Sequence, residues 1–427
     1  MFRSRLPLGQ CFALFLTLGA ILPLDAILPP SGSILLPPPA AAQGSPELPP
    51  GFQKIWQEAS RELRDTLEAT GMVGASWAFF HGGAYATHEL FGHADLERGR
   101  RVDEATIYHW GSITKTLTGI AIMQLRDRGL LALNDPILKY VPELRDVHNP
   151  LGDMGAITLR HLLSHSAGFR SPTWPWGGGE DWHPHEPTEW SQIVAMLPYT
   201  EVRFLPGSRY QYSNPGIVFL GQVIERLSGE EWEVYVEKNI LRPLGMRRSY
   251  FDYTPRHLLP HRSNNYQVRD GVPVANGLDF DTGITVSNGG LNAPLSDMAL
   301  YLAFLTDTGK GEDRAYYRDV LSRESLEEMW QAVVPVGETG DLRESMGLCF
   351  FLEAYGGLEL VGHTGSQKAV FSFFYIHPET GTGAIAAFNS NGVGGDNPPR
   401  PNTRQILNGF RETLFRDVFP LFTGQAP

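Results

Sequence analysis

Segments with strand character lie near both ends of the sequence, and a long block of mainly helical character separates them. Residues 73–80 and 84–91 are predicted to form a hairpin around 81–83. Strand character returns late in the chain, at 346–351, 358–361, 370–376 and 384–389. This division predicts one sheet that is assembled from both ends of the chain.

Helical patterns precede the hairpin and fill the central block. Apolar residues recur at helical spacing over 52–67, and Gly71 ends this helix. Between about residues 136 and 340 the sequence predicts helices joined by long loops, at 158–166, 214–227, 232–240, 297–305 and 325–334. A last helix over 403–415 is expected to lie on the sheet.

The composition indicates a globular protein. The 427 residues are 42% apolar and 19% charged, which is enough apolar material for a packed core. The formal net charge of −12 argues against nucleic acid as a partner. No cofactor, metal or obligatory protein partner is expected.

Residues 1–42 are predicted to be a signal peptide, followed by a Pro/Gly linker over 43–51. Two arginines in the first five residues precede a short apolar core, and a run of three alanines at 40–42 offers a cleavage site. The protein is therefore expected to be exported, periplasmic or secreted; an uncleaved membrane anchor is the alternative. After cleavage Cys349 would be the one cysteine left, which excludes an intramolecular disulfide.

Ser112-Ile113-Thr114-Lys115 places a hydroxyl and an amine one helical turn apart, at the start of an apolar helix that ends near Gly129. A serine hydroxyl becomes a good nucleophile when a nearby base takes its proton, and a lysine with a lowered pKa can be that base. The chain has only six lysines against 29 arginines, and arginine cannot be deprotonated in a protein. This segment is a candidate catalytic pair; a solvated surface lysine is the alternative interpretation.

Two further segments carry polar groups that are suited to chemistry. Tyr212 and Asn214 lie on a loop bounded by Pro-Gly pairs, where a phenol can transfer protons and an amide can orient a carbonyl. His363-Thr364-Gly365-Ser366 follows one predicted strand and precedes another, and its glycine would let a substrate backbone approach the strand edge. Each segment on its own is more often structural than functional.

Together, Ser112-x-x-Lys115, Tyr212-x-Asn214 and His363-Thr364-Gly365 resemble the motif set of the serine β-lactamase and penicillin-recognising hydrolase superfamily. The chain is most similar to its class C-like branch, which includes the family VIII carboxylesterases and D-aminopeptidase-type hydrolases. The resemblance covers about residues 52–415.

The resemblance implies an α+β, β-lactamase/transpeptidase-like fold. In this fold an antiparallel sheet is flanked by helices, an all-helical subdomain is added, and the active site lies between them. A single domain over 52–420 is expected, with an α/β part at 52–135 and 341–420 and a helical part at 136–340.

The same resemblance assigns roles to particular residues. Ser112 would be the nucleophile that forms an acyl-enzyme, and Lys115 and Tyr212 would share the proton transfers as general base and acid. The substrate-binding and oxyanion-hole positions would be Asn214, His363, Gly365 and Ser366. The oxyanion hole would use the backbone N–H groups of Ser112 and Ser366.

His363 departs from the β-lactamases and penicillin-binding enzymes, which carry a lysine at this position. A histidine is mostly neutral near pH 7 and anchors a carboxylate less well. We therefore expect a small-molecule ester, amide or peptide substrate without an obligatory carboxylate. Two alternatives stay open: a β-lactamase or D,D- or D-amino-acid peptidase acting on cell-wall peptides, and a non-catalytic descendant that binds a peptide.

Residues 169–190 are rich in tryptophan, and Trp174, Trp176 and Trp182 are a candidate lid over the acyl pocket; a packed surface loop is the alternative. His161 and His165 stand four residues apart and resemble a zinc pair, but no glutamate follows the first histidine. A structural role is favoured for both, and no metal site is predicted.

Overall fold

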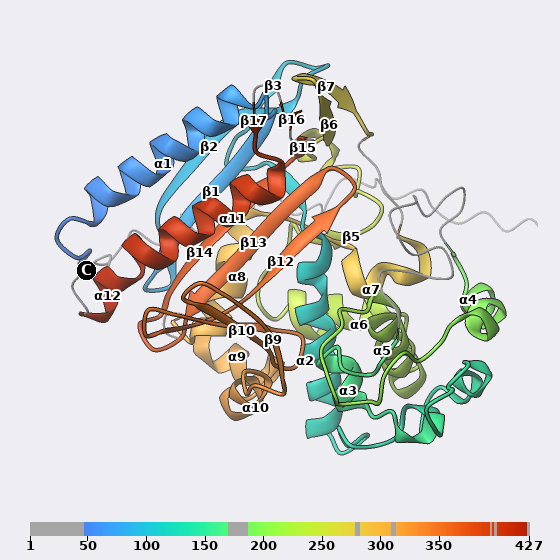
Figure 1. Ribbon diagram of the computed structural model, residues 1–427. Coiled ribbons are helices and arrows are strands. Elements are labelled where there is room, and N and C mark those ends of the chain that lie inside the picture. Colours follow the sequence, from blue (N-terminus) through green and yellow to red (C-terminus); the bar gives the residue numbers. More distant parts are fainter. Residues whose placement is uncertain are drawn as a thin grey trace, which may run out of the picture. The chain divides into compact units, whose positions relative to one another are not determined.

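The computed structural model describes residues 47–424 apart from 170–186, 278–281, 309–312, 393–394 and 397–398 (Figure 1). Within these ranges, no helix combines the length and apolar character that a membrane crossing requires. The candidate lid residues Trp174, Trp176 and Trp182 lie outside the described residues.

A nine-stranded antiparallel sheet has the strand order β3-β2-β1-β14-β13-β12-β11-β10-β9. Its strands are β1 (Gly74–His81), β2 (Ala84–Asp95), β3 (Arg100–Arg101), β9 (Val334–Thr339), β10 (Leu342–Met346), β11 (Phe351–Tyr355), β12 (Leu358–Gln367), β13 (Val370–His377) and β14 (Thr382–Phe388). β1 pairs with β14, with Ala75 opposite Phe388 and His81 opposite Thr382. The early hairpin is thus joined to the late strands, which confirms the predicted assembly from both ends (Figure 1).

Two details of this sheet differ from the sequence expectation. The strand predicted over 346–351 is wrong, because residues 347–350 connect β10 to β11. Cys349 there has a φ of 62°, outside the extended region of regular strands, and its N–H donates to the carbonyl of Leu163. The His363-Thr364-Gly365-Ser366 segment lies inside β12 and does not follow it.

Helices α1 (Phe52–Ala69) and α11 (Thr403–Thr413) cover one face of the sheet (Figure 1). α1 forms because its apolar residues fall on one side, and Phe52 and Trp56 are buried there. They pack with Trp77 of β1 and Phe410 of α11 in one aromatic core. A π-helical turn (Leu414–Val418) and α12 (Pro420–Thr423) continue α11 along this face.

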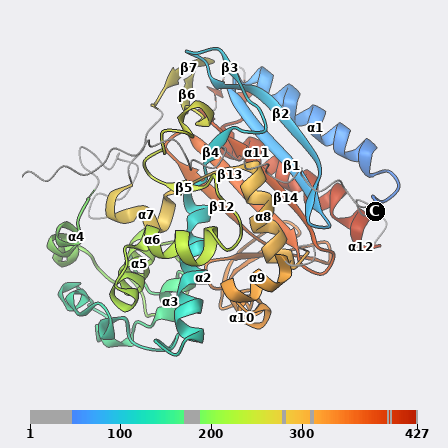
Figure 2. The ribbon, with the colours of Figure 1, turned by 180° about the vertical axis from the view of Figure 1, so that it is seen from behind.

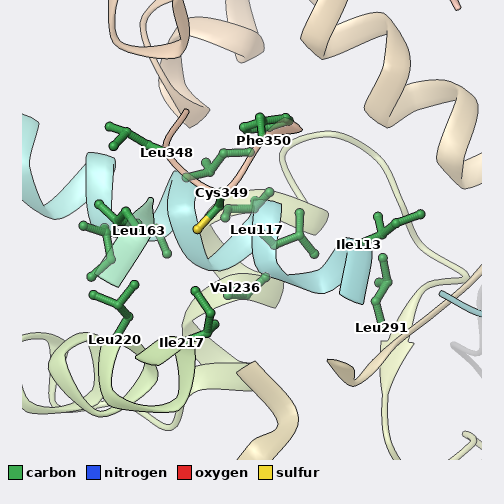
Figure 3. Packing of buried hydrophobic residues seen from close by; sticks show 14 of the residues in the cluster. Ile113, Leu117, Leu163, Ile217, Leu220, Val236, Leu291, Leu348, Cys349 and Phe350 are labelled. Atoms are coloured by element: carbon green, nitrogen blue, oxygen red, sulfur yellow. The ribbon is translucent and has the colours of Figure 1, made fainter. Parts of the chain in front are cut away.

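The other face of the sheet packs against the helices of the central block (Figure 2). These are α2 (Thr114–Asp127), α3 (Leu159–Leu163), α4 (Trp190–Met196), α5 (Asn214–Ser228), α6 (Trp232–Val236), α7 (Val286–Gly289), α8 (Leu295–Thr306), α9 (Asp313–Val320) and α10 (Arg323–Met329). α2 is buried from residue 114 to residue 125 and forms the centre of this core. Figure 3 shows Cys349 in the same core with Leu117, Leu163 and Ile217.

Outside the nine-stranded sheet, the described residues also form short strands that the sequence analysis did not identify. β4 (Ile107–His109), β8 (Leu291–Pro294) and β5 (Tyr250–Phe251) form one small sheet, and β15 (Ser390–Gly392), β6 (Tyr266–Arg269) and β7 (Val272–Ala275) form another. β16 (Gly395–Asp396) pairs with β17 (Pro399–Arg400). Strands of two to four residues leave too little periodicity to be read from a sequence.

Candidate active site

Ser112 lies on a 3₁₀ turn, Gly111–Ile113, that leads directly into α2. The turn requires glycine at 111, where φ is 54° and a Cβ atom would lie 3.2 Å from the backbone nitrogen of Ser366. The Thr114 hydroxyl donates to the Gly111 carbonyl (2.7 Å) and fixes the turn. The hydroxyl of Ser112 is thereby held at the N-terminal end of α2, where the helix dipole favours negative charge.

Lys115 is fully buried in the first turn of α2. Its Nζ donates to Ser112 Oγ (2.8 Å) and to the Asn288 carbonyl oxygen (2.7 Å), and it lies 4.9 Å from the centre of the Tyr212 ring. The sequence analysis did not predict that the carbonyl of Asn288 would contact Lys115. The only sequence feature that points to this segment is the Gly289-Gly290-Leu291 stretch directly after it. Two fixed acceptors and one aromatic face therefore determine where the amine sits.

Burial holds the pKa of Lys115 well below its usual 10.5. No aspartate or glutamate pairs with this lysine in the described part of the chain, and the nearby Cys349 thiol has its own pKa raised to about 12 by burial. The thiol is thus uncharged near pH 7. The lysine can exist as a neutral amine, which is the form that accepts a proton from a hydroxyl.

Tyr212 and Asn214 lie at the start of α5. Ser213 caps this helix, because its hydroxyl accepts the N–H of Gly216 (3.2 Å). Burial raises the pKa of Tyr212 well above 10, an effect that the neighbouring Ser112 hydroxyl offsets only in part. Tyr212 Oη and Asn214 Oδ1 are buried and have no hydrogen-bond partner among the described residues.

The end of β12 lies against the turn that carries Ser112. Gly365 is required there, since a Cβ atom would lie 2.0 Å from the Trp110 carbonyl oxygen and 2.3 Å from Ser372 Oγ. This close approach places the backbone N–H of Ser366 beside Gly111. Two backbone amides, those of residues 112 and 366, therefore belong to adjoining segments, as an oxyanion hole requires.

His363 is fully buried on the same strand. Its Nδ1 lies 2.6 Å from the Thr364 carbonyl oxygen, which can only accept, so Nδ1 carries the proton. Burial and the nearby Lys115 amine lower the pKa of His363 to about 3, and the ring is neutral at pH 7. Its Nε2 is then a lone-pair acceptor, and it has no partner in the described ranges.

The structure thus brings Ser112, Lys115 and Tyr212 together, and β12 adds His363 and Ser366 beside them. Asn214 begins the helix that follows Tyr212. Sequence reasoning missed the close contact of His165 with Tyr212, whose ring centres lie 4.4 Å apart. His165 falls inside the helix predicted over 158–166, where a histidine carries no signal for that contact, whereas α3 ends at Leu163.

Comparison with known proteins places this arrangement in a family. The model of the Beta-lactamase family matches residues 59–407. Protein flp of Staphylococcus aureus strain N315 is 26% identical over 53% of this chain and 44% of its own length. Esterase EstB of Burkholderia gladioli is 28% identical over 56% of this chain and 62% of its own length. The chain thus matches only about half the length of the first of these curated relatives.

A solved structure gives the same result over more of the chain. The octameric penicillin-binding protein homologue from Pyrococcus abyssi is 30% identical, with a TM-score of 0.67, over 78% of this chain and 73% of its own. This likeness confirms the predicted fold class, an antiparallel sheet flanked by helices with a helical region added. Because the family model matches residues 59–407, which is well over half of this chain, the chain belongs to the beta-lactamase family.

Proposed function

We propose that this protein is a serine hydrolase that cleaves an ester or amide through an acyl-Ser112 intermediate. The observation that carries the proposal is the contact of 2.8 Å between Ser112 Oγ and a fully buried lysine amine that lacks a carboxylate partner among the described residues. A structural lysine would be expected to pair its charge or to reach solvent.

The geometry supports a two-step reaction. Lys115, as the neutral amine, takes the proton of Ser112 while Oγ attacks the substrate carbonyl, whose oxygen becomes negative in the space next to the amides of residues 112 and 366. The Tyr212 hydroxyl, unpartnered and buried, is placed to pass a proton to the leaving group. Water then attacks the acyl-enzyme and gives a proton to the same groups, which deliver one to Ser112 Oγ as its bond to the acyl carbon breaks.

His363 favours a substrate without a carboxylate at this end of the site. The one N–H of its neutral ring is already used by the Thr364 carbonyl, so the other nitrogen offers only a lone pair. A lone pair repels a carboxylate and accepts from an N–H or O–H group. The similarity to an esterase of Burkholderia gladioli is in keeping with this choice.

Export and the range of partners belong to the same proposal. The basic, apolar and small-residue pattern of residues 1–42 supports a cleaved signal peptide. The mass of the protein recovered from its host would test this directly. A mass that retains residues 1–42 would contradict cleavage. The proposed ligand is a small ester, amide or peptide, with no nucleic acid involved.

The function is tested by initial rates on p-nitrophenyl butyrate for the wild type and for Ser112→Ala. Loss of the nucleophile should lower kcat by about 10⁴-fold or more. Ser164→Ala is the matched control, because Ser164 is a buried serine whose hydroxyl bonds to Ser166 and to backbone carbonyls. Equal rates for wild type and Ser112→Ala would refute the mechanism.

Two reagents separate the alternatives. Rapid turnover of nitrocefin, or stable labelling by penicillin, would favour a β-lactamase or cell-wall peptidase over an esterase. Failure of the wild type to react with any fluorophosphonate would favour a binding protein that has lost catalysis.

A further inference from the structure

Tyr212 lies in a segment of irregular backbone, two residues before α5 begins. Its position must therefore be fixed by contacts from other parts of the chain. His165 supplies such contacts on both sides: its carbonyl oxygen accepts the N–H of Gln211 (2.8 Å), and its Nδ1 accepts the N–H of Ser213 (3.2 Å). One residue thus holds the chain directly before and directly after the tyrosine.

The His165 ring also lies against Tyr212 itself. The two ring centres are 4.4 Å apart with an interplanar angle of 34°. The Tyr212 ring is at the same time 4.9 Å from Lys115 Nζ. The Tyr212 ring therefore packs between the His165 ring and the Lys115 amine. A displacement of the His165 side chain would also displace the Tyr212 ring and change the surroundings of the amine.

The backbone conformation of His165 does not by itself explain why this residue is a histidine. It occupies the position after the end of α3, where the N–H of Ser166 donates to the His161 carbonyl (2.8 Å) and that of His165 donates to the Leu162 carbonyl (3.1 Å). The φ of His165 is 53°, in the left-handed region. Glycine or asparagine is usual in this helix-ending motif, so the motif alone does not explain a histidine.

The charge state of His165 excludes it as a proton carrier. Because Nδ1 accepts an N–H, the proton of the neutral ring is on Nε2. Burial holds the pKa of His165 well below 6.5. The ring is neutral at pH 7, and its role is to hold other groups in place.

We propose that His165 is a positioning residue that fixes the Tyr212 phenol beside Lys115 and Ser112. This inference rests on the proposed function. Its consequence is testable because the Tyr212 ring is one of the groups packed around the buried amine of Lys115. If that ring moves, water reaches the amine and the pKa of Lys115 rises toward its ordinary value.

The experiment compares His165→Gly with His165→Asn on p-nitrophenyl butyrate. Both residues tolerate the left-handed backbone, but only asparagine offers an oxygen that can accept the N–H of Ser213. Glycine should lower kcat by about 100-fold with little change in KM, since the substrate still binds but the proton-transfer group is displaced. In the glycine variant, the acid limb of the pH–kcat profile should move to higher pH. Asparagine should recover most of kcat and the wild-type limb.

His161→Ala is the matched control for folding. His161 lies on α3 and accepts the N–H of Thr158 through Nδ1 (3.2 Å), with no ring contact to Tyr212 in the described structure. This variant should lower Tm without moving the acid limb. A glycine variant at 165 with kcat within threefold of wild type would overturn the inference, as would an asparagine variant no more active than glycine.

If His165→Gly does not fold, His165→Asn decides alone. The inference requires its acid limb to coincide with that of the wild type, and a displaced limb overturns it. The proposed function fails separately: a fully active Ser112→Ala variant overturns both, whereas an inactive Ser112→Ala with unaffected His165 variants overturns only the positioning role.

Discussion

The two faces of the nine-stranded sheet each bury an ionisable group, but only one of the two groups has a partner of opposite charge. On the face under α11, Glu353 is fully buried and accepts hydrogen bonds from Arg411 Nη1 (2.8 Å) and from the hydroxyl of Tyr375. On the opposite face, Lys115 is equally buried but contacts only neutral groups in the described structure. Arg411 and Tyr375 offset part of the cost of burying the Glu353 charge, whereas no carboxylate among the described residues offsets the cost of a charge on Lys115.

This difference separates a structural site from a chemical one. A buried charge with a partner of opposite sign is held in place, and removing the partner lowers the stability of the fold strongly. A buried amine without such a partner gives up its proton more easily, at the cost of folding energy. The family membership of the chain and the contact with Ser112 agree with a chemical role for the unpaired group.

The largest expected effect comes from Lys115→Met, which keeps the side-chain volume but removes the amine. We expect kcat to fall by about 10⁴-fold, because the base that activates Ser112 is gone. At pH 7 we expect the free energy of unfolding to rise by about 1 kcal/mol or more. The wild type must either release a proton or bury a charge when it folds.

The sign of this stability gain can be checked by pH. The folded pKa of Lys115 lies below the unfolded one, so its cost to stability is absent above about pH 10.4 and grows as the pH falls. Urea unfolding at pH 7 and pH 10 should therefore show a gain for Lys115→Met that shrinks at the higher pH. A variant that is less stable than wild type at pH 7 would mean that the bonds to Ser112 and Asn288 outweigh desolvation.

The opposite substitution tests the other face. Arg411→Met leaves the Glu353 carboxyl buried without its cation, and we expect a loss of about 3 kcal/mol in the free energy of unfolding. The kcat of the folded enzyme should not change, because α11 packs on one face of the sheet and α2, which follows Ser112, belongs to the core on the other. Arg416→Met is the control: its partner Asp417 is exposed, and loss of that pair should cost less than about 1 kcal/mol. Equal losses for both variants would contradict the comparison.

The sequence carried different amounts of information about the two faces. Amphipathic spacing predicts α1, and the strand segments at both ends predict one shared sheet, which the structure joins through the pairing of β1 with β14. Ser112 and Lys115 were found because a hydroxyl and an amine stand one helical turn apart, and Tyr212 was found because the three motifs together resemble those of a known family. Glu353 and Arg411 were not found, since they stand 58 residues apart and no local pattern reports which distant side chains will meet.

The same limit explains what was missed around the candidate site. The carbonyl of Asn288 and the contact of His165 with Tyr212 both depend on backbone positions set by tertiary packing. A sequence lists side chains, whereas this site also uses backbone groups, such as the carbonyl oxygen of Asn288. The turn at 347–350 was read as a strand because its apolar residues are buried in a loop, which periodicity cannot separate from a buried strand.

The smallest expected effect is a change in how stability depends on pH. Burial raises the pKa of Glu353 to about 7 even though Arg411 and Tyr375 oppose this shift, and Glu344 lies opposite it on β10. A folded pKa above the unfolded value gives stability that is present below about pH 4.5 and is lost as the pH rises through 7. Glu353→Gln keeps the acceptor oxygen but removes this titration.

The measurement is the difference in unfolding free energy between wild type and Glu353→Gln at pH 5 and at pH 8. The wild type should lose about 1 kcal/mol or more relative to the variant over this interval. Using the difference removes the contribution of other groups, such as His109, whose pKa is lowered to about 4. The same difference in unfolding free energy at both pH values would show that Arg411 keeps Glu353 ionised throughout. Glu353 would then be fully charged in the folded protein, in contrast to the neutral amine proposed for Lys115.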